Sequence, residues 1–144
     1  MTEPKTILLV EPVERMRNMI KRDWITKRPS LLVVETETCA DARRLLQETS
    51  VDAIVTDNFR PELAGCELIC WIRQQQDLAH LPIVAIPAMS NIVEDALPIT
   101  RPLHEAGADS VIYKFFYNEV LSTLKRWRWQ RPERQEPGWA LDHL

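Results

Sequence analysis

Glycine is scarce in this chain: three residues among 144, far apart at positions 65, 107 and 138. A dinucleotide-binding loop needs three closely spaced glycines, and a phosphate-binding P-loop needs two glycines followed by lysine and then serine or threonine. Neither loop can be built from Gly65, Gly107 and Gly138. The sequence therefore disfavours two large classes of nucleotide-binding α/β enzymes.

Cysteine is also sparse, because Cys39, Cys66 and Cys70 make an odd number without a C-x-x-C pair. This pattern argues against both a disulfide framework and a zinc site. We interpret the three thiols as small, buried apolar side chains.

Long apolar runs and basic stripes are missing as well. The longest segment without a formal charge, residues 78–93, is interrupted by Pro82 and Pro87 and is shorter than the roughly 20 apolar residues of a membrane helix. The N-terminal segment MTEPKTILLVEP has too short an apolar run for a secretory signal. With a net charge of −3, we expect a cytoplasmic domain that contacts neither membrane nor nucleic acid.

What the sequence does contain is a regular alternation of two patterns, in a length that suits one domain. Five short apolar runs alternate with segments of helical periodicity, which predicts a doubly wound α/β fold with a parallel sheet. The runs are mostly continuous, as in strands covered on both faces. The expected strands are Thr6–Val10, Leu31–Glu35, Val51–Thr56, Pro82–Ile86 and Ser110–Tyr113.

Helical periodicity fills the segments between these runs. A first helix carries an apolar stripe from Val13 to Trp24, and Thr38 begins a capping-box pattern for a second. We expect a third helix after Gly65 and a last one capped by Asn118.

The segment from Pro87 to Gly107 breaks this regularity, since it also holds Pro98 and Pro102. A proline inside a helix costs about 3 kcal/mol, so we expect a broken or shortened helix whose final turn is Leu103–Ala106.

Three charged residues follow strand ends: Glu11, Asp57 and Lys114. In an open parallel sheet, ligands bind outside the carboxyl ends of the strands, so these side chains are expected to meet. Two carboxylates and an ammonium group suit phosphoryl transfer, with a carboxylate as nucleophile and the cation balancing charge.

Four segments in order resemble the receiver domain of bacterial response regulators, from Thr6 to about Trp127. Asp57, Pro61 and Gly65 match the D-x3-P-x3-G signature of that family, and Lys114 matches its lysine. The segments are ILLVEP at 7–12, DNFRPELAG at 57–65, LPIVAIPA at 81–88 and AGADSVIYK at 106–114.

The resemblance implies a flavodoxin-like, five-stranded sheet of order 2-1-3-4-5. Asp57 would accept a phosphoryl group from a histidine kinase or a phosphotransfer protein, and Lys114 would neutralise it. Mg²⁺ would be bound by Glu11, by Asp57 and by the backbone carbonyl of Phe59. A downstream protein target and a homodimer are the other partners that such a signalling module, rather than an enzyme, would have.

The sequence departs from the family pattern at four positions, which predicts a weak Mg²⁺ site and an unusual switch. Pro12 stands where the family has a second acid, and Pro87 stands where it has a threonine or serine. Val111 replaces the aromatic residue of strand five, and Phe115 replaces a proline.

Two other functions stay open at this stage. The first is a pseudo-receiver that binds partners without phosphorylation. The second is a dehalogenase-like phosphatase, which is disfavoured because Phe59 stands where a second acid is needed. We place the receiver domain at residues 1–128, followed by a tail or linker at 129–144 that contains tryptophan and proline.

Overall fold

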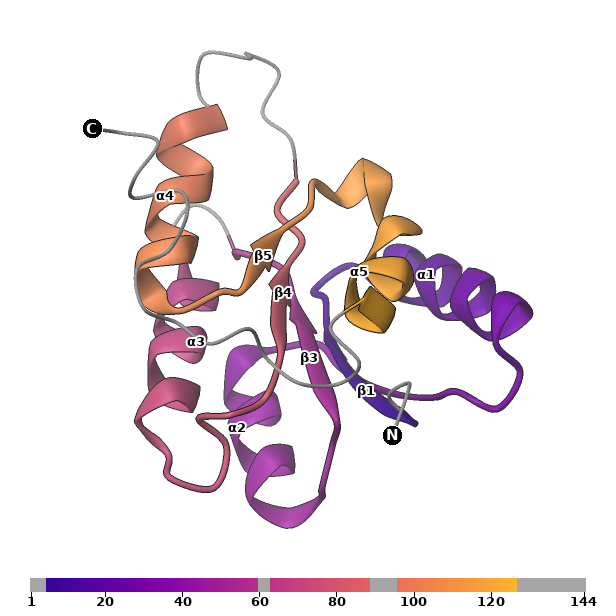
Figure 1. The fold of residues 1–144 in the computed structure, drawn as a ribbon, viewed down its shortest axis with the longest axis horizontal. Coiled ribbons are helices and arrows are strands. Elements are labelled where there is room, and N and C mark those ends of the chain that lie inside the picture. The colour runs from indigo at the N-terminus through magenta and orange to yellow at the C-terminus, as the bar shows by residue number, and fades with distance from the viewer. Residues whose placement is uncertain (1–4, 60–62, 89–95, 127–144) are drawn as a thin grey trace.

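The computed structural model describes residues 5–59, 63–88 and 96–126 of the chain. It contains a five-stranded parallel sheet of order β2-β1-β3-β4-β5, as predicted (Figure 1). The strands are Thr6–Val10 (β1), Leu32–Thr36 (β2), Ala53–Thr56 (β3), Ile83–Ala85 (β4) and Ser110–Val111 (β5). The observed strands β3, β4 and β5 are shorter than the apolar runs that predicted them.

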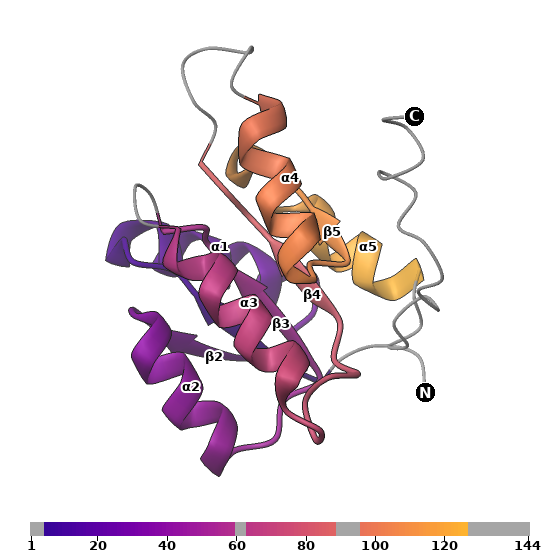
Figure 2. The same cartoon turned by 90° about the vertical axis from the view of Figure 1, so that its left-hand side faces the viewer.

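Helices cover both faces of the sheet. Figures 1 and 2 show α1 and α5 on one side, and α2, α3 and α4 on the other. The helices are Glu14–Lys27 (α1), Cys39–Glu48 (α2), Ala64–Gln74 (α3), Ala96–Ala106 (α4) and Glu119–Arg126 (α5), with a 3₁₀ turn at Lys114–Phe116 (η2). Within the described ranges, every helix is too short or too polar to cross a membrane.

The two-sided cover explains the continuous apolar runs of the strands. Successive residues of β1 alternate between the two cores: Leu8 packs toward α2, α3 and α4, whereas Ile7 and Leu9 pack toward α1 and α5. Trp24 of α1 is fully buried in the second core, and its indole N–H donates to the carbonyl of Tyr117 at 3.1 Å. This bond fixes the segment after η2 against α1, so it also fixes the direction in which the chain leaves Lys114.

Two local predictions about helices were wrong in detail. Val13 is 51% exposed and precedes α1 in an extended conformation, so the helical stripe begins later than the sequence pattern suggested. Gly65 lies inside the first turn of α3 rather than before the helix. The predicted cap at Thr38 is present, because its hydroxyl accepts a hydrogen bond from the backbone N–H of Asp41 at 3.1 Å.

Helix α4 is shortened as expected, and it ends at Ala106, but it is not broken at its prolines. Pro98 is the third residue of the helix, where a backbone N–H would have no intrahelical acceptor. Pro102 lies inside the helix and removes one bond, which the packing of the fully buried Leu103 offsets. Gly107 follows with φ of 126°, a value that favours glycine and stops the helix.

Several sequence-based predictions fall outside the described residues. These are Pro61 of the signature, the tryptophan-containing tail and the domain boundary at 128/129.

Candidate functional site

The strand order brings three predicted residues to one end of the sheet. Val10 pairs with Thr56 in the β1–β3 register, so the next residues, Glu11 and Asp57, leave neighbouring strands side by side. The backbone N–H of Asp57 extends this ladder by donating to the carbonyl of Val10 at 2.9 Å. Lys114 follows β5 and is placed against the end of β4, since its N–H donates to the carbonyl of Pro87 at 2.9 Å.

The Lys114 ammonium group joins the two carboxylates. Its Nζ lies 2.6 Å from Glu11 Oε1 and also contacts Asp57 Oδ1. The Glu11 side chain is fully buried, and those of Asp57 and Lys114 are 7% and 13% exposed. A buried charge is costly unless it is paired, and here one cation serves two anions. The cluster therefore keeps an excess negative charge that a further cation could balance.

Backbone groups orient the remaining carboxylate oxygens. Oε2 of Glu11 accepts a hydrogen bond from the N–H of Val13 at 2.9 Å, and Oδ2 of Asp57 accepts one from the N–H of Phe59 at 2.7 Å. The backbone carbonyl of Glu11 is also bound by the guanidinium group of Arg17 at 2.7 Å. The two carboxylates are thus held in place before any ligand binds.

The loop after Asp57 has unusual backbone geometry. Phe59 and Leu63 have φ of 58° and 59°, left-handed values that cost about 1–2 kcal/mol in a residue other than glycine. The N–H of Leu63 donates to the carbonyl of Phe59 at 2.8 Å, and that of Gly65 donates to the carbonyl of Asn58 at 3.1 Å. A β-carbon at Gly65 would lie 2.3 Å from the carbonyl oxygen of Asp57. Glycine is therefore required where the first turn of α3 passes the backbone that follows β3.

The donors present form a reduced set for Mg²⁺. Mg²⁺ keeps several of its water ligands, so it needs only a few oxygen ligands from the protein. Two carboxylates and the Phe59 carbonyl, which has a second lone pair, can supply them. Pro12 offers no side-chain donor, and the part of the chain that the structure describes holds no cluster of three acidic, histidine or cysteine residues suited to a metal. The residues therefore fit Mg²⁺ with fewer protein ligands than the family pattern supplies.

The positions that depart from the family pattern surround this cluster. Pro87 contributes its carbonyl to Lys114 and has no hydroxyl or N–H to offer. Val111 is half-buried against the core beneath α4. Phe115 is 82% exposed and packs edge-to-face on Phe116, with ring centroids 5.2 Å apart. Burial raises the pKa of Tyr113, so its hydroxyl stays protonated at neutral pH.

The cysteines are less buried than the sequence suggested. Cys39 and Cys66 are half-buried, and Cys70 is exposed because Leu68 and Ile69 occupy the core face of α3. Burial raises the pKa of Cys39 to about 11, while the charge of Arg43 lowers it and that of Asp57 raises it. This thiol is therefore neutral at physiological pH.

Sequence reasoning missed the groups that hold Glu11 and a buried neighbour of Asp57. Neither the N–H of Val13 nor the side chain of Arg17 belongs to a recognisable motif. Asn58 is 1% exposed, and its side-chain nitrogen has no hydrogen-bond partner within the described part of the chain. Its position directly after the strand-end aspartate was the available signal.

Comparison with known proteins agrees with this geometry. The chain is 29% identical over 118 residues to histidine kinase P4 of Formosa agariphila, covering 79% of this chain and 8% of the kinase. It is 29% identical over 122 residues to the transcriptional regulatory protein GltR of Pseudomonas aeruginosa, covering 84% and 48%. The chain thus spans about half the length, or less, of these two relatives.

Among solved structures, the chain is similar to the receiver domain of the sensor histidine kinase PA1611 of Pseudomonas aeruginosa, determined with a magnesium ion in its active-site cleft. The identity is 25% and the TM-score is 0.69, over 86% of this chain and 97% of that one. The profile of the family described as "Response regulator receiver domain" matches residues 7–125, which include Glu11, Asp57 and Lys114. This chain belongs to the receiver domain family of two-component response regulators.

Proposed function

We propose that this receiver accepts a phosphoryl group on Asp57. The observation that carries the proposal is the contact of the Lys114 ammonium group with Asp57 at the carboxyl ends of the strands, in a largely buried cluster. A lysine held there supplies positive charge where a phosphoryl group on Asp57 would bring negative charge. The N–H of Phe59, now bound to Oδ2 of Asp57, is a second donor beside the same carboxylate.

The transfer needs little covalent chemistry from the protein. A carboxylate oxygen of Asp57 attacks the phosphorus of a phosphohistidine, the P–N bond breaks, and its electron pair leaves with the imidazole. Lys114 and the N–H of Phe59 orient the carboxylate before the attack, and they offset charge on the phosphoryl oxygens afterwards. In-line transfer requires the donor to approach from the open end of the sheet.

Glu11, Asp57 and the Phe59 carbonyl would hold the Mg²⁺ ion. The ion neutralises charge on the phosphoryl oxygens when it is bound. Because Pro12 removes a donor and Lys114 already occupies an oxygen of each carboxylate, we expect weaker Mg²⁺ binding than in receivers with two adjacent acids.

The partners follow from this role. The phosphodonor is a histidine kinase or a phosphotransfer protein, and the phosphorylated receiver acts on a downstream protein, as a monomer or a homodimer. We propose that the receiver domain extends to residue 128, with residues 129–144 as a linker or tail.

Phosphorylation by a small donor tests the proposal. Incubation with acetyl phosphate and Mg²⁺ should add the mass of one phosphoryl group, and Asp57→Asn should abolish the addition. Asp77→Asn, at an exposed carboxylate outside the cluster, serves as the matched control and should leave the addition intact. A folded chain that gains no phosphoryl group under these conditions, or gains it in the Asp57→Asn variant, contradicts the proposal.

A pseudo-receiver that signals without phosphate is the second candidate. One observation favours it: Pro87 has no N–H or hydroxyl with which to donate a hydrogen bond to a phosphoryl oxygen. In that case Asp57, Glu11 and Lys114 are a structural cluster, and partner binding is the same in the wild-type chain and in Asp57→Asn. A binding difference between phosphorylated and unphosphorylated protein would eliminate this candidate.

A further inference from the structure

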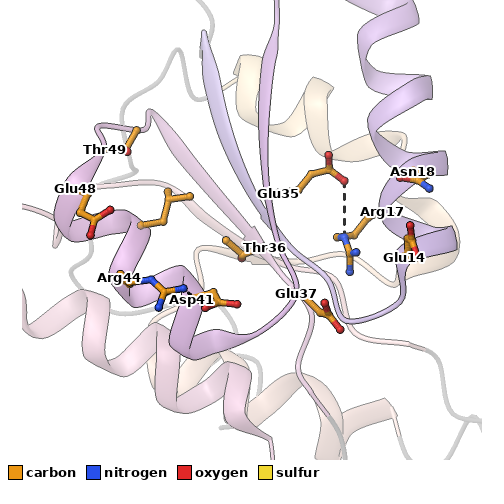
Figure 3. Close-up of a pocket in the computed structure, with 11 residues that line it drawn as sticks. Glu14, Arg17, Asn18, Glu35, Thr36, Glu37, Asp41, Arg44, Glu48 and Thr49 are labelled. Carbon is orange, nitrogen blue, oxygen red and sulfur yellow. Dashed lines mark hydrogen bonds and ion pairs between the residues drawn. The ribbon is translucent and has the colours of Figure 1, made fainter.

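A hollow of about 630 Å³ lies beside the edge strand β2, and its lining does not include the three residues of the Asp57 cluster. Its walls come from α1 on one side of the strand and from α2 on the other, with the end of β2 between them (Figure 3). The lining residues are Glu14, Arg17, Asn18, Glu35, Thr36, Glu37, Asp41, Arg44, Leu45, Glu48 and Thr49. Neither Asp57 nor Lys114 is among them, so the hollow is a site separate from the phosphoacceptor cluster.

The charge in this hollow is negative and only partly balanced. Five carboxylates line it against two guanidinium groups. Both guanidinium groups are engaged locally, since Arg17 lies 3.8 Å from Glu35 and Arg44 contacts Asp41. Glu35 is also paired with Lys21 of α1, whose Nζ lies 2.9 Å from its Oε2. The three other carboxylates have no ion-pair partner within the described ranges; they belong to Glu14, Glu37 and Glu48. A ligand that pairs with these three carboxylates carries positive charge.

The edge of β2 adds backbone groups that have no hydrogen-bond partner among the described residues. In a parallel ladder, alternate residues direct their N–H and C=O groups to the same neighbour. Leu32 donates to Lys5 and the carbonyl of Thr36 accepts from Glu11, at 2.8 and 3.0 Å, so residues 32, 34 and 36 face β1. The backbone groups of Val33 and Glu35 consequently point away from β1; Val33 is 5% exposed, and Glu35 is the more open of the two. An unpaired edge of this kind is a template for an additional strand.

Thr36 supplies an independent sign of a missing partner. This residue is 8% exposed, and its hydroxyl oxygen has no hydrogen-bond partner among the residues that the structure describes. Buried hydroxyl groups are normally hydrogen-bonded. Thr36 lines the hollow, and Figure 3 shows it between Glu14 of α1 and the acidic residues of α2, Asp41 and Glu48.

We propose that this hollow docks an extended, basic segment of a partner protein, which adds to the outer edge of β2. Its backbone pairs with Val33 and Glu35, and its lysine or arginine side chains reach Glu37 and Glu48. The surface also touches the phosphoacceptor cluster, because Arg17 lines the hollow and donates to the carbonyl of Glu11. The docking itself is independent of phosphorylation, so the two proposals can fail separately.

The test uses a hexapeptide of alternating arginine and threonine, titrated into the isotope-labelled full chain and followed by NMR. Binding should shift the amide signals of Val33 and Glu35. A backbone N-methylated version of the peptide keeps every charge but loses its N–H donors, and it should bind more weakly. A peptide of alternating glutamate and threonine should not bind.

Variants that remove a charge test whether the peptide binds in the hollow. Glu37→Gln and Glu48→Gln should each weaken binding roughly two- to fivefold, as expected for partly exposed ion pairs. Both residues are exposed, so the fold should survive; Asp77→Asn removes an equally exposed carboxylate elsewhere and should have no effect. Absence of binding overturns the proposal, as does binding that is unchanged in both glutamine variants. Equal affinity for the N-methylated peptide, or for the polyamine spermine, also overturns it, because charge alone would then account for binding.

Discussion

Lys114 Nζ lies 2.6 Å from Glu11 Oε1 although 103 positions separate the two residues in the sequence. Strand order accounts for the contact, because β1, β3 and β4 are neighbours and Lys114 is tied to the end of β4. The same ammonium group contacts Asp57, so the site consists of two buried anions with one cation between them. This imbalance leads to the first two predictions.

Lys114→Met should lower the free energy of unfolding by about 3 kcal/mol, because it leaves two buried carboxylates without their shared counter-ion. Added Mg²⁺ should recover part of the loss, since the metal replaces the missing positive charge. Urea unfolding with EDTA and with Mg²⁺ measures both effects. Lys27→Met, at an exposed position of α1, provides the control and should change stability by less than about 0.5 kcal/mol. An unchanged Lys114→Met variant would show that the ion pair is not stabilising.

Pro12→Asp should strengthen Mg²⁺ binding by about tenfold, which corresponds to about 1.4 kcal/mol. The new carboxylate would stand directly after Glu11, where the family has its second acid, and the position is exposed enough to accept it. Isothermal titration with MgCl₂ gives the affinity. Val13→Asp adds the same charge one residue later and retains the N–H that binds Glu11. This variant therefore distinguishes direct coordination of Mg²⁺ by residue 12 from the general electrostatic attraction of an added carboxylate. Equal gains in the two variants would rule out direct coordination by residue 12.

Sequence reasoning succeeded where one physical rule governs the position. A continuous apolar run identifies a strand covered on both faces, and the residue that follows it must lie at the sheet end; this placed Glu11, Asp57 and Lys114 correctly. This argument does not give the strand order, because periodicity does not say which strands are neighbours. The order came from the family resemblance.

The failures occurred where packing overrides local preference. Pro102 is tolerated inside α4 because the packing of Leu103 outweighs a lost hydrogen bond, and a sequence gives no measure of that packing. Val13 fits a helical stripe yet is exposed, because the chain is still extended there and its N–H holds Glu11. The hollow beside β2 escaped detection although α1, β2 and α2 follow one another in the sequence, because a periodic pattern does not show how far apart two helices pack on opposite faces of a strand.

Arg73→Lys should lower the free energy of unfolding by about 2–3 kcal/mol. The guanidinium group donates to the carbonyls of Gly107, Ala79 and Leu81 at 2.7–3.0 Å and pairs with the buried carboxylate of Asp109 at 2.8 Å. Lysine has a single nitrogen and cannot reproduce this fork, so several buried acceptors lose their donor.

The midpoint of urea unfolding measures this loss. Arg101→Lys changes an exposed arginine that pairs with Glu105 one helical turn away, and it should shift stability by at most about 0.5 kcal/mol. Similar midpoints for the two variants would mean that the buried network contributes no more than a surface pair.

Alkylation of Cys39 should report the charge on Asp57. Because burial holds the pKa of Cys39 at about 11, roughly one thiol in a thousand is ionised at pH 8, and iodoacetamide should react about tenfold faster for each pH unit up to pH 10. The unfolded thiol ionises near 9.0, so the folded state binds more protons between pH 9 and 11, and stability falls as pH rises through that window. Asp57→Asn removes a negative charge that raises this pKa, so Cys39 should react faster at pH 8. Peptide mapping by mass spectrometry measures the rate, with the exposed Cys70 as internal reference; an unchanged ratio of the two rates in Asp57→Asn would show that Cys39 does not sense the acceptor.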